Sequence, residues 1–242
     1  MITIRHAHER GHANHGWLDT YHTFSFGDYY DAQHTQFRSL RVMNEDTVQP
    51  GQGFGTHPHR DMEIVTYVLE GALQHKDSMG NGEVLRPGEF QRMSAGTGIT
   101  HSEFNHSTSE GVHFLQIWMG ADRKGVTPRY NQKTFSDQQK RGKLCPLLVP
   151  EGETKDAAMP WYSDSRVYAG LFDGAERSEL NLGPNRYAYV HVIRGKVKVN
   201  GTQLDDGDGA RVRNEQTLVF SDGRDAEILV FDLRPREVPD VP

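Results

Sequence analysis

The sequence contains little of what disulfide-bonded, membrane-spanning or nucleic-acid-binding proteins usually require. Its single cysteine, Cys145, excludes an intramolecular disulfide and favours a reducing compartment. No apolar stretch approaches the ~20 residues that span a bilayer, and the first residues show no apolar signal-peptide segment. The formal net charge of −6 disfavours binding to nucleic acid through a general positive field. We therefore expect a cytoplasmic protein with neither a membrane nor a nucleic acid as partner.

Helical periodicity is also scarce, and the best helical candidate is the polar stretch 132–142. Short β-rich runs separated by glycine recur instead along most of the 242 residues, for example "EIVTYVLEG", "VHFLQIWMG" and "EILVFDL". Such runs are typical of an antiparallel β sandwich or barrel. The length suits one large domain or two smaller ones. The sequence therefore predicts an all-β protein.

A weak internal repeat indicates two copies of one β unit. Residues 66–89 read as strand, Glu-Gly, strand, turn, strand and Pro-Gly, and residues 190–212 follow the same order with Arg-Gly and Asp-Gly. Gly71 of the first copy matches Gly195 of the second. The stretch 120–162 is poor in strand pattern and rich in Lys, Asp, Gly and Pro, as a connection would be. We expect a first domain over 1–125, a connecting segment over 126–160 and a second domain over 161–242.

Two pairs of polar residues share the spacing that puts side chains on one face of a strand. His57 and His59 open the run "GTHPHRDMEIVTYVLEG", and residues i and i+2 of a strand lie roughly 6.5–7 Å apart. His101 and Glu103 repeat the spacing in "GTGITHSEFNH". Two strands, each with one inward-facing pair, would offer three imidazoles and one carboxylate to a single ion. The alternative is that these four residues are ordinary surface polar groups.

The second repeat lacks such ligands. The positions that match His57 and His59 are Asn181 and Gly183, so any metal should belong to the first domain. Imidazole and carboxylate ligands suit Fe(II), Mn(II), Ni(II), Co(II), Cu(II) or Zn(II). Four protein ligands around a six-coordinate ion would leave two positions for a substrate oxygen and a second small molecule.

Other polar residues near the two motifs could support the ligands. Glu63 follows His59 by four residues on what reads as one strand, so it could be a ligand or a hydrogen-bonding neighbour. Asn105 and His106 follow Glu103 closely and could lie next to the ligands. His113 is a similar candidate. For the N-terminal histidines His12, His15 and His22, packing or capping is favoured over ligation. His75 is expected in the middle of a strand, beyond the site.

The two motifs resemble the cupin pattern, in which a small β-barrel carries Gly, His-x-His, Glu and Gly, then Gly, Pro-x-Gly, His and Asn at set spacings. The first motif runs here from Gly51 to Gly71 with one extra residue before the closing glycine. The second runs from Gly88 to Asn105, with Ser94 in place of the proline and four residues before the histidine. These departures, and the segments "HTFSFGDYYD", "LRVMNEDTVQPGQGFGTHPHRDMEIVTYVLEG" and "MSAGTGITHSEFN", are similar to the pirin family.

The resemblance covers the chain from "RGHANHGW" through Trp118, with a looser match beyond. It implies two tandem cupin barrels with one divalent transition metal, iron above all, in the first. The ligands it implies are His57, His59, His101 and Glu103, which makes Glu63 a near neighbour. Cu, Mn, Ni, Co and Zn remain alternatives to iron.

Bacterial-type members of the family look like quercetin 2,3-dioxygenases. The resemblance thus implies that the chain opens the ring of quercetin-like flavonols with O₂ and releases carbon monoxide, with Glu103 taking the proton of the substrate hydroxyl. Flavonols could also stand in for another enolisable aromatic substrate. Eukaryotic members are described as iron-dependent transcription co-regulators, so the alternative is a redox-sensitive metal-binding regulatory protein without turnover. The sequence names no protein partner.

Overall fold

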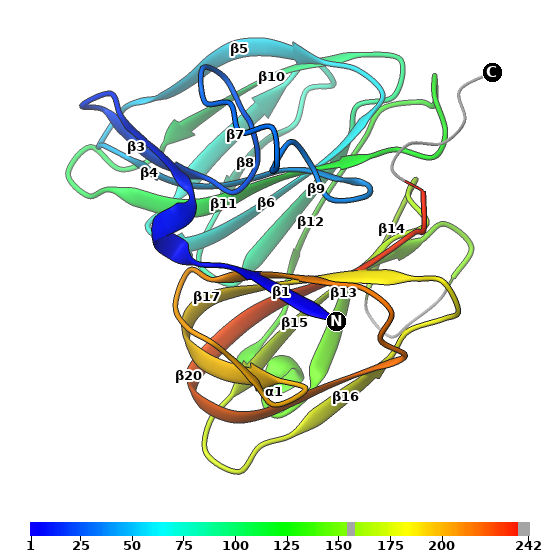
Figure 1. The fold of residues 1–242 in the computed structure, drawn as a ribbon. Coiled ribbons are helices and arrows are strands. Elements are labelled where there is room, and N and C mark those ends of the chain that lie inside the picture. The colour runs from blue at the N-terminus through cyan, green and yellow to red at the C-terminus, as the bar shows by residue number, and fades with distance from the viewer. Residues whose placement is uncertain (154–157, 237–242) are drawn as a thin grey trace.

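The computed structural model describes residues 1–153 and 158–236 and confirms the prediction of an all-β protein. Figure 1 shows two β units, one above the other. The helical elements of the described ranges are a 3-10 turn at Ala7–Glu9 and the four-residue helix α1 (Asp137–Lys140), which lies inside the predicted helical stretch. Neither of these short segments of the described chain approaches the length or apolar character that crossing a membrane requires.

The first unit consists of two antiparallel sheets packed face to face. Its larger sheet contains, in spatial order, β12 (Arg129–Thr134), β9 (Glu89–Ser94), β6 (Met62–Glu70), β11 (Val112–Gly120), β4 (Leu40–Val48), β3 (Leu18–His22) and β2 (Gly11–Asn14). Its smaller sheet contains β5 (Gly53–His59), β10 (Ile99–Asn105), β7 (Leu73–Asp77) and β8 (Gly82–Leu85). The two predicted ligand pairs therefore lie on neighbouring strands, β5 and β10.

The second unit is built on one nine-stranded sheet. Its path runs through β1 (Ile2–Arg5), β19 (Gly209–Val212), β17 (Tyr187–Val199), β20 (Thr217–Leu233), β15 (Arg166–Phe172), β13 (Leu144–Pro150) and β14 (Met159–Trp161). Two further strands pair with the long ones: β16 (Ser178–Asn181) with β20, and β18 (Thr202–Leu204) with β17. Register shifts along the β17–β20 pair let these long strands bend, as β-bulges do.

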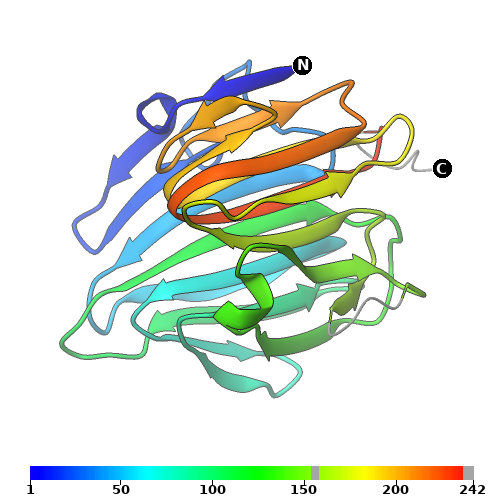
Figure 2. The ribbon, with the colours of Figure 1, turned by 90° about the horizontal axis from the view of Figure 1, so that it is seen from below.

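The chain crosses between the units near both ends of the first one. The strand β1 pairs with β19, and Figure 2 shows this blue strand beside the orange strands of the second unit. Within the expected connecting segment, β12 pairs with β9 of the first unit, whereas β13 pairs with β15 of the second. The domain bounds 1–125, 126–160 and 161–242 stay a prediction.

The two glycines matched by the repeat both have a left-handed backbone. Gly71 has φ 77° and Gly195 has φ 71°. A Cβ at Gly71 would lie 2.4 Å from the carbonyl oxygen of Gly111, and one at Gly195 would lie 2.4 Å from that of Arg224. Only glycine satisfies both constraints at these turns.

Apolar packing differs between the interiors of the two units. The interior of the second unit is one continuous cluster of buried apolar side chains, which includes Val190 and Phe220. The interior of the first unit is divided between a cluster around Phe114 and a smaller one around Met93. The largest cluster lies between the units and includes Tyr67 and Leu115 of the first with Trp161 and Phe231 of the second. Between the two apolar clusters of the first unit lie polar side chains.

Candidate metal centre and ligand cavity

A row of buried polar side chains crosses the larger sheet of the first unit. Strand register places one residue from each of five neighbouring strands side by side, and each is at most 8% exposed: Gln91, Thr66, Gln116, Asn44 and His22. The row lies between the two apolar clusters of this interior. Because burying polar groups costs free energy unless they are hydrogen-bonded, such a row at the centre of a sandwich indicates a site.

Three histidines meet on the facing sheet. His101 pairs with His57 across β10 and β5, and His59 lies two residues further along β5. The Nε2 atoms of His57 and His101 are 2.9 Å apart, and the three rings offer nitrogens within 4.8 Å of one another. Two ligand nitrogens at right angles, each about 2.1 Å from an ion, would be about 3 Å apart. The spacing therefore fits chelation of one ion.

Hydrogen bonds and burial determine which imidazole nitrogens have a lone pair free to bind an ion. The Nδ1 of His57 lies 2.8 Å from the carbonyl oxygen of Gly55, so this nitrogen donates and leaves Nε2 for an ion. The Nε2 of His59 is buried and without a hydrogen-bond partner in the described part of the chain. Burial, helped by the charge of His57, lowers the pKa of His59 to about 4 and that of His101 to about 2. Neutral imidazoles with free lone pairs fit a divalent transition metal.

Glu103 lies beside this cluster, with its carboxylate held by the polar row. Gln116 Nε2 donates to Glu103 Oε2 at 2.7 Å, and Thr66 Oγ1 lies 3.2 Å from Oε1. The carboxylate forms a second potential ligand group with His75 and His101, again within 4.8 Å. Burial raises the pKa of Glu103 to about 7. His101 belongs to both groups, so the carboxylate of Glu103 lies next to the three-histidine cluster.

The structure brings His75 to the site, although the sequence pattern placed it beyond. His75 pairs with Glu103 across β7 and β10, and its Nδ1 lies 3.5 Å from Nδ1 of His101. Its Nε2 lies 3.0 Å from Oδ2 of Asp77. Such a chain of partners orients a ligand imidazole from behind. The His-x-Asp spacing of "HKD", the same as in the two ligand pairs, is the signal that could have revealed it.

The three residues expected to support the ligands make other contacts. Glu63 accepts a hydrogen bond from Ser94 Oγ at 2.8 Å, and it lies three residues from Thr66, hence on the opposite face of β6. The chain turns between β5 and β6 into a different sheet, so the alternation that linked Glu63 to the first motif does not continue. Asn105 donates to the main-chain carbonyls of Val48 and Glu110, and His106 is exposed. A supporting role for these residues stays a prediction.

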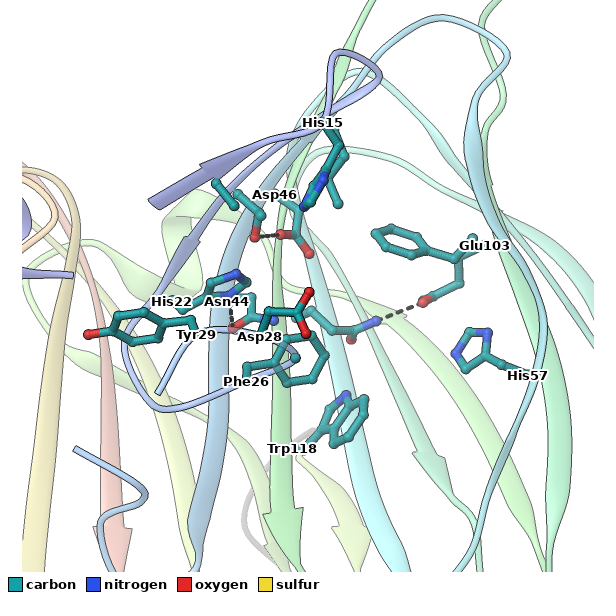
Figure 3. Close-up of a pocket in the computed structure, with 16 residues that line it drawn as sticks. His15, His22, Phe26, Asp28, Tyr29, Asn44, Asp46, His57, Glu103 and Trp118 are labelled. Carbon is teal, nitrogen blue, oxygen red and sulfur yellow. Dashed lines mark hydrogen bonds between the residues drawn. The ribbon is translucent and has the colours of Figure 1, made fainter. Parts of the chain in front are cut away.

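A cavity of about 350 Å³ adjoins the centre. Figure 3 shows His57 and Glu103 on one side of it and His22 and Tyr29 on the other. Trp118 and residues of the 26–29 loop form part of its wall. The volume is near the lower end of the range for small-molecule pockets. The arrangement provides a confined space in which a small planar ligand would reach both the histidines and the polar row.

Comparisons with known proteins agree with this architecture. The pirin family model matches residues 3–119, and the model of the quercetinase C-terminal cupin domain matches residues 148–233. The protein named quercetin 2,3-dioxygenase from Escherichia coli K12 is 47% identical over 235 residues, which are 97% of this chain and 100% of that one. A Pseudomonas aeruginosa protein named putative quercetin 2,3-dioxygenase PA1210 is 42% identical, covering 96% and 100%.

Solved structures show the same fold. The bacterial pirin YhhW of E. coli, crystallised in complex with nickel(II), aligns with a TM-score of 0.91 at 46% identity, covering 97% of this chain and 100% of that one. A quercetin 2,3-dioxygenase from Acinetobacter baumannii aligns with a TM-score of 0.70 at 24% identity, covering 90% and 81%. The expected pair of tandem cupin domains is thereby confirmed, although the sheets do not close into continuous barrels. The chain belongs to the pirin family.

Proposed function

We propose that this protein is a metal-dependent dioxygenase that opens the ring of quercetin-like flavonols with O₂ and releases carbon monoxide. The observation that carries the proposal is the meeting of three histidine side chains and a buried carboxylate at one side of a small cavity. The names of the curated relatives support flavonols as the substrate class.

In this proposal His57, His59 and His101 hold one divalent metal, with Glu103 as the fourth ligand. The bound metal would supply Lewis-acid polarisation of a substrate oxygen and redox chemistry toward O₂. Iron is the metal that we propose. The same nitrogen and oxygen donors suit nickel, which YhhW holds in its crystal structure.

Glu103 is the residue that we propose to take the proton of the flavonol 3-hydroxyl. It lines the cavity, and its two oxygens face Gln116 and Thr66, which fix the plane of the carboxylate. A base must be held within hydrogen-bond reach of the proton that it removes, and this pair provides the restraint. His75, backed by Asp77, would orient His101 from behind.

The aromatic side chains of the cavity favour a planar ligand. Phe26 and Trp118 meet edge to face with centroids 5.4 Å apart, and Trp118 also meets His59 edge to face at 4.9 Å. Flat aromatic ligands pack well against such walls, because offset and edge-to-face contacts between rings are favourable. Apolar walls also exclude water from the reacting carbon atoms.

The test combines metal analysis with a flavonol assay. The protein as purified is analysed for metals, stripped, and reloaded with each candidate ion, and loss of quercetin absorbance and uptake of O₂ are then followed. We expect turnover with at least one ion, and its loss in His59→Ala and in Glu103→Gln. The matched control is His12→Ala, which removes an exposed imidazole on β2 that does not line the cavity and should keep turnover. Full metal occupancy without turnover across a flavonol panel would contradict the enzyme and favour the regulatory protein.

A further inference from the structure

The cavity extends past the metal centre to a second pair of polar residues. Asn44 and Asp46 lie two residues apart on β4, so both point to the same face, and both line the cavity. Asn44 is opposite Gln116 in the strand register, one strand further from the carboxylate of Glu103. Neighbouring strands are about 4.8 Å apart. A molecule bound at the metal would therefore reach this pair with a different part of its structure.

Each residue of the pair has one polar atom engaged and one directed to the cavity. His22 Nδ1 lies 3.0 Å from Asn44 Oδ1, so the amide oxygen accepts from the ring and the amide nitrogen of Asn44 remains a donor. Thr20 Oγ1 donates to Oδ1 of Asp46, and in Figure 3 the second oxygen of Asp46 points into the cavity. A hydrogen-bond donor and an acceptor are thus presented side by side.

Asp46 is poorly satisfied for a buried acid. Its side chain belongs to a residue that is only 4% exposed, and the hydrogen bond from Thr20 is a neutral one. Neither an arginine nor a lysine of the described chain forms an ion pair with it. A buried carboxyl group of this kind is costly unless further donors reach it. A hydroxyl of a bound ligand would supply the missing donor.

An aromatic ring lines the end of the cavity that lies away from His57 (Figure 3). Tyr29 stacks on His22 with centroids 6.0 Å apart and an angle of 21° between the planes. Arg5 Nη2 donates to Tyr29 Oη at 2.8 Å. The ring also lies so close to Gly11 that a Cβ there would be 2.6 Å from it. The Tyr29 ring is therefore held in place at this end of the cavity.

We propose that Asn44 and Asp46 form a specificity subsite that binds a phenolic hydroxyl on the ring of the ligand that lies away from the metal. The ligand class is a planar aromatic molecule with hydroxyl groups at both ends. Its identification as a flavonol rests on the proposed function. Asp46 accepts the hydroxyl proton in a hydrogen bond, Asn44 donates to the hydroxyl oxygen, and His22 and Thr20 hold the two side chains in place.

The test measures binding in the absence of O₂, so that it does not depend on turnover. Metal-loaded protein is titrated anaerobically with two series of flavonols. Galangin, kaempferol and quercetin differ only in the hydroxyls of the phenyl ring, and 3-hydroxyflavone and galangin differ only in those of the fused ring. We expect the wild type to prefer the hydroxylated member of one series by about tenfold or more. Asp46→Asn and Asn44→Leu should abolish that preference while binding of the least hydroxylated member changes little.

The matched control is Glu45→Gln, which neutralises the adjacent carboxyl group on the opposite face of β4, where it contacts Arg10 and His113. It should keep the wild-type preference. Metal content and circular dichroism of each variant show that the site and fold persist. Equal preferences in the wild type and the Asp46→Asn variant in both series would overturn the subsite, as would absence of binding by all these flavonols. Hydroxyl-dependent binding without turnover would overturn the dioxygenase proposal alone.

Discussion

The Nε2 atoms of His57 and His101 lie 2.9 Å apart across two antiparallel strands, with the Nδ1 proton of His57 donated to Gly55. A cation bound between the two nitrogens would accept the lone pairs of both. We therefore expect chelation to destabilise the protein and return of the ion to restore it. An ion at 100 times its Kd contributes about 2.7 kcal/mol, which for a chain of this size is roughly 5–10 °C in Tm. Scanning calorimetry before and after chelation measures this, and superimposable curves from loaded and stripped samples would rule out a stabilising ion.

His75 should influence metal affinity without being one of the three clustered histidines that we propose as ligands. Its contact with His101, supported by Asp77, orients that ring, and loss of such a partner typically weakens metal binding 10–100-fold. We expect His75→Gln to show a decrease of this size in competition with a chromophoric chelator. His12→Gln, which alters an exposed imidazole on β2, is the control. Unchanged affinity in His75→Gln would mean that the ring only fills space.

Glu63 should make the protein less stable as the pH rises. Burial raises the pKa of its carboxyl group from 4.5 to about 7. Between these two values the folded state binds the proton and the unfolded state releases it, so stability falls as the pH increases through this window. Glu63→Gln lacks this penalty and should gain about 2–3 kcal/mol relative to wild type between pH 4.5 and pH 8. Urea unfolding of both proteins at the two pH values provides the comparison, and parallel pH profiles would refute the shift.

The two matched glycines should tolerate no side chain. Gly71→Ala and Gly195→Ala each combine a positive φ with a Cβ that would lie 2.4 Å from a carbonyl oxygen. We expect each to lower the free energy of unfolding by about 2 kcal/mol or more. Gly82→Ala, where a Cβ would meet open space and φ is not positive, should change stability little. Denaturant unfolding of the three variants tests the contrast, which would disappear if the backbone adjusted freely.

The local features of the fold were accessible from the sequence, and the pairings between distant segments were not. Alternating apolar residues and glycine turns predicted strands, and the matched Gly71 and Gly195 predicted two copies of one unit. That β1 joins the sheet of the second unit depends on contact between Ile4 and Ala210, which no local pattern reveals. The largest cluster of buried side chains, between the units, is likewise a property of packing.

The same distinction applies to the site. The spacing of His57 and His59 indicates a shared face, because strand geometry alone fixes it. The contact of Glu103 with Gln116 instead depends on a register irregularity between His101 and Glu103 and on the packing of two sheets. The polar row that includes Asn44 appears only when five strands are aligned, since its members are scattered from residue 22 to residue 116.

The pairing of β1 with β19 has a consequence for dissecting the molecule. The four residues Ile2–Arg5 supply an edge strand to the C-terminal half, while the next strand, β2, joins the N-terminal half. A fragment that starts after the connecting segment would leave the main-chain N–H and C=O groups of β19 unpaired at the sheet edge. Such an edge favours aggregation through strand pairing between molecules. To express the C-terminal half alone in soluble form, residues Ile2–Arg5 would have to be supplied to it, by fusion or as a separate peptide, as in donor-strand complementation.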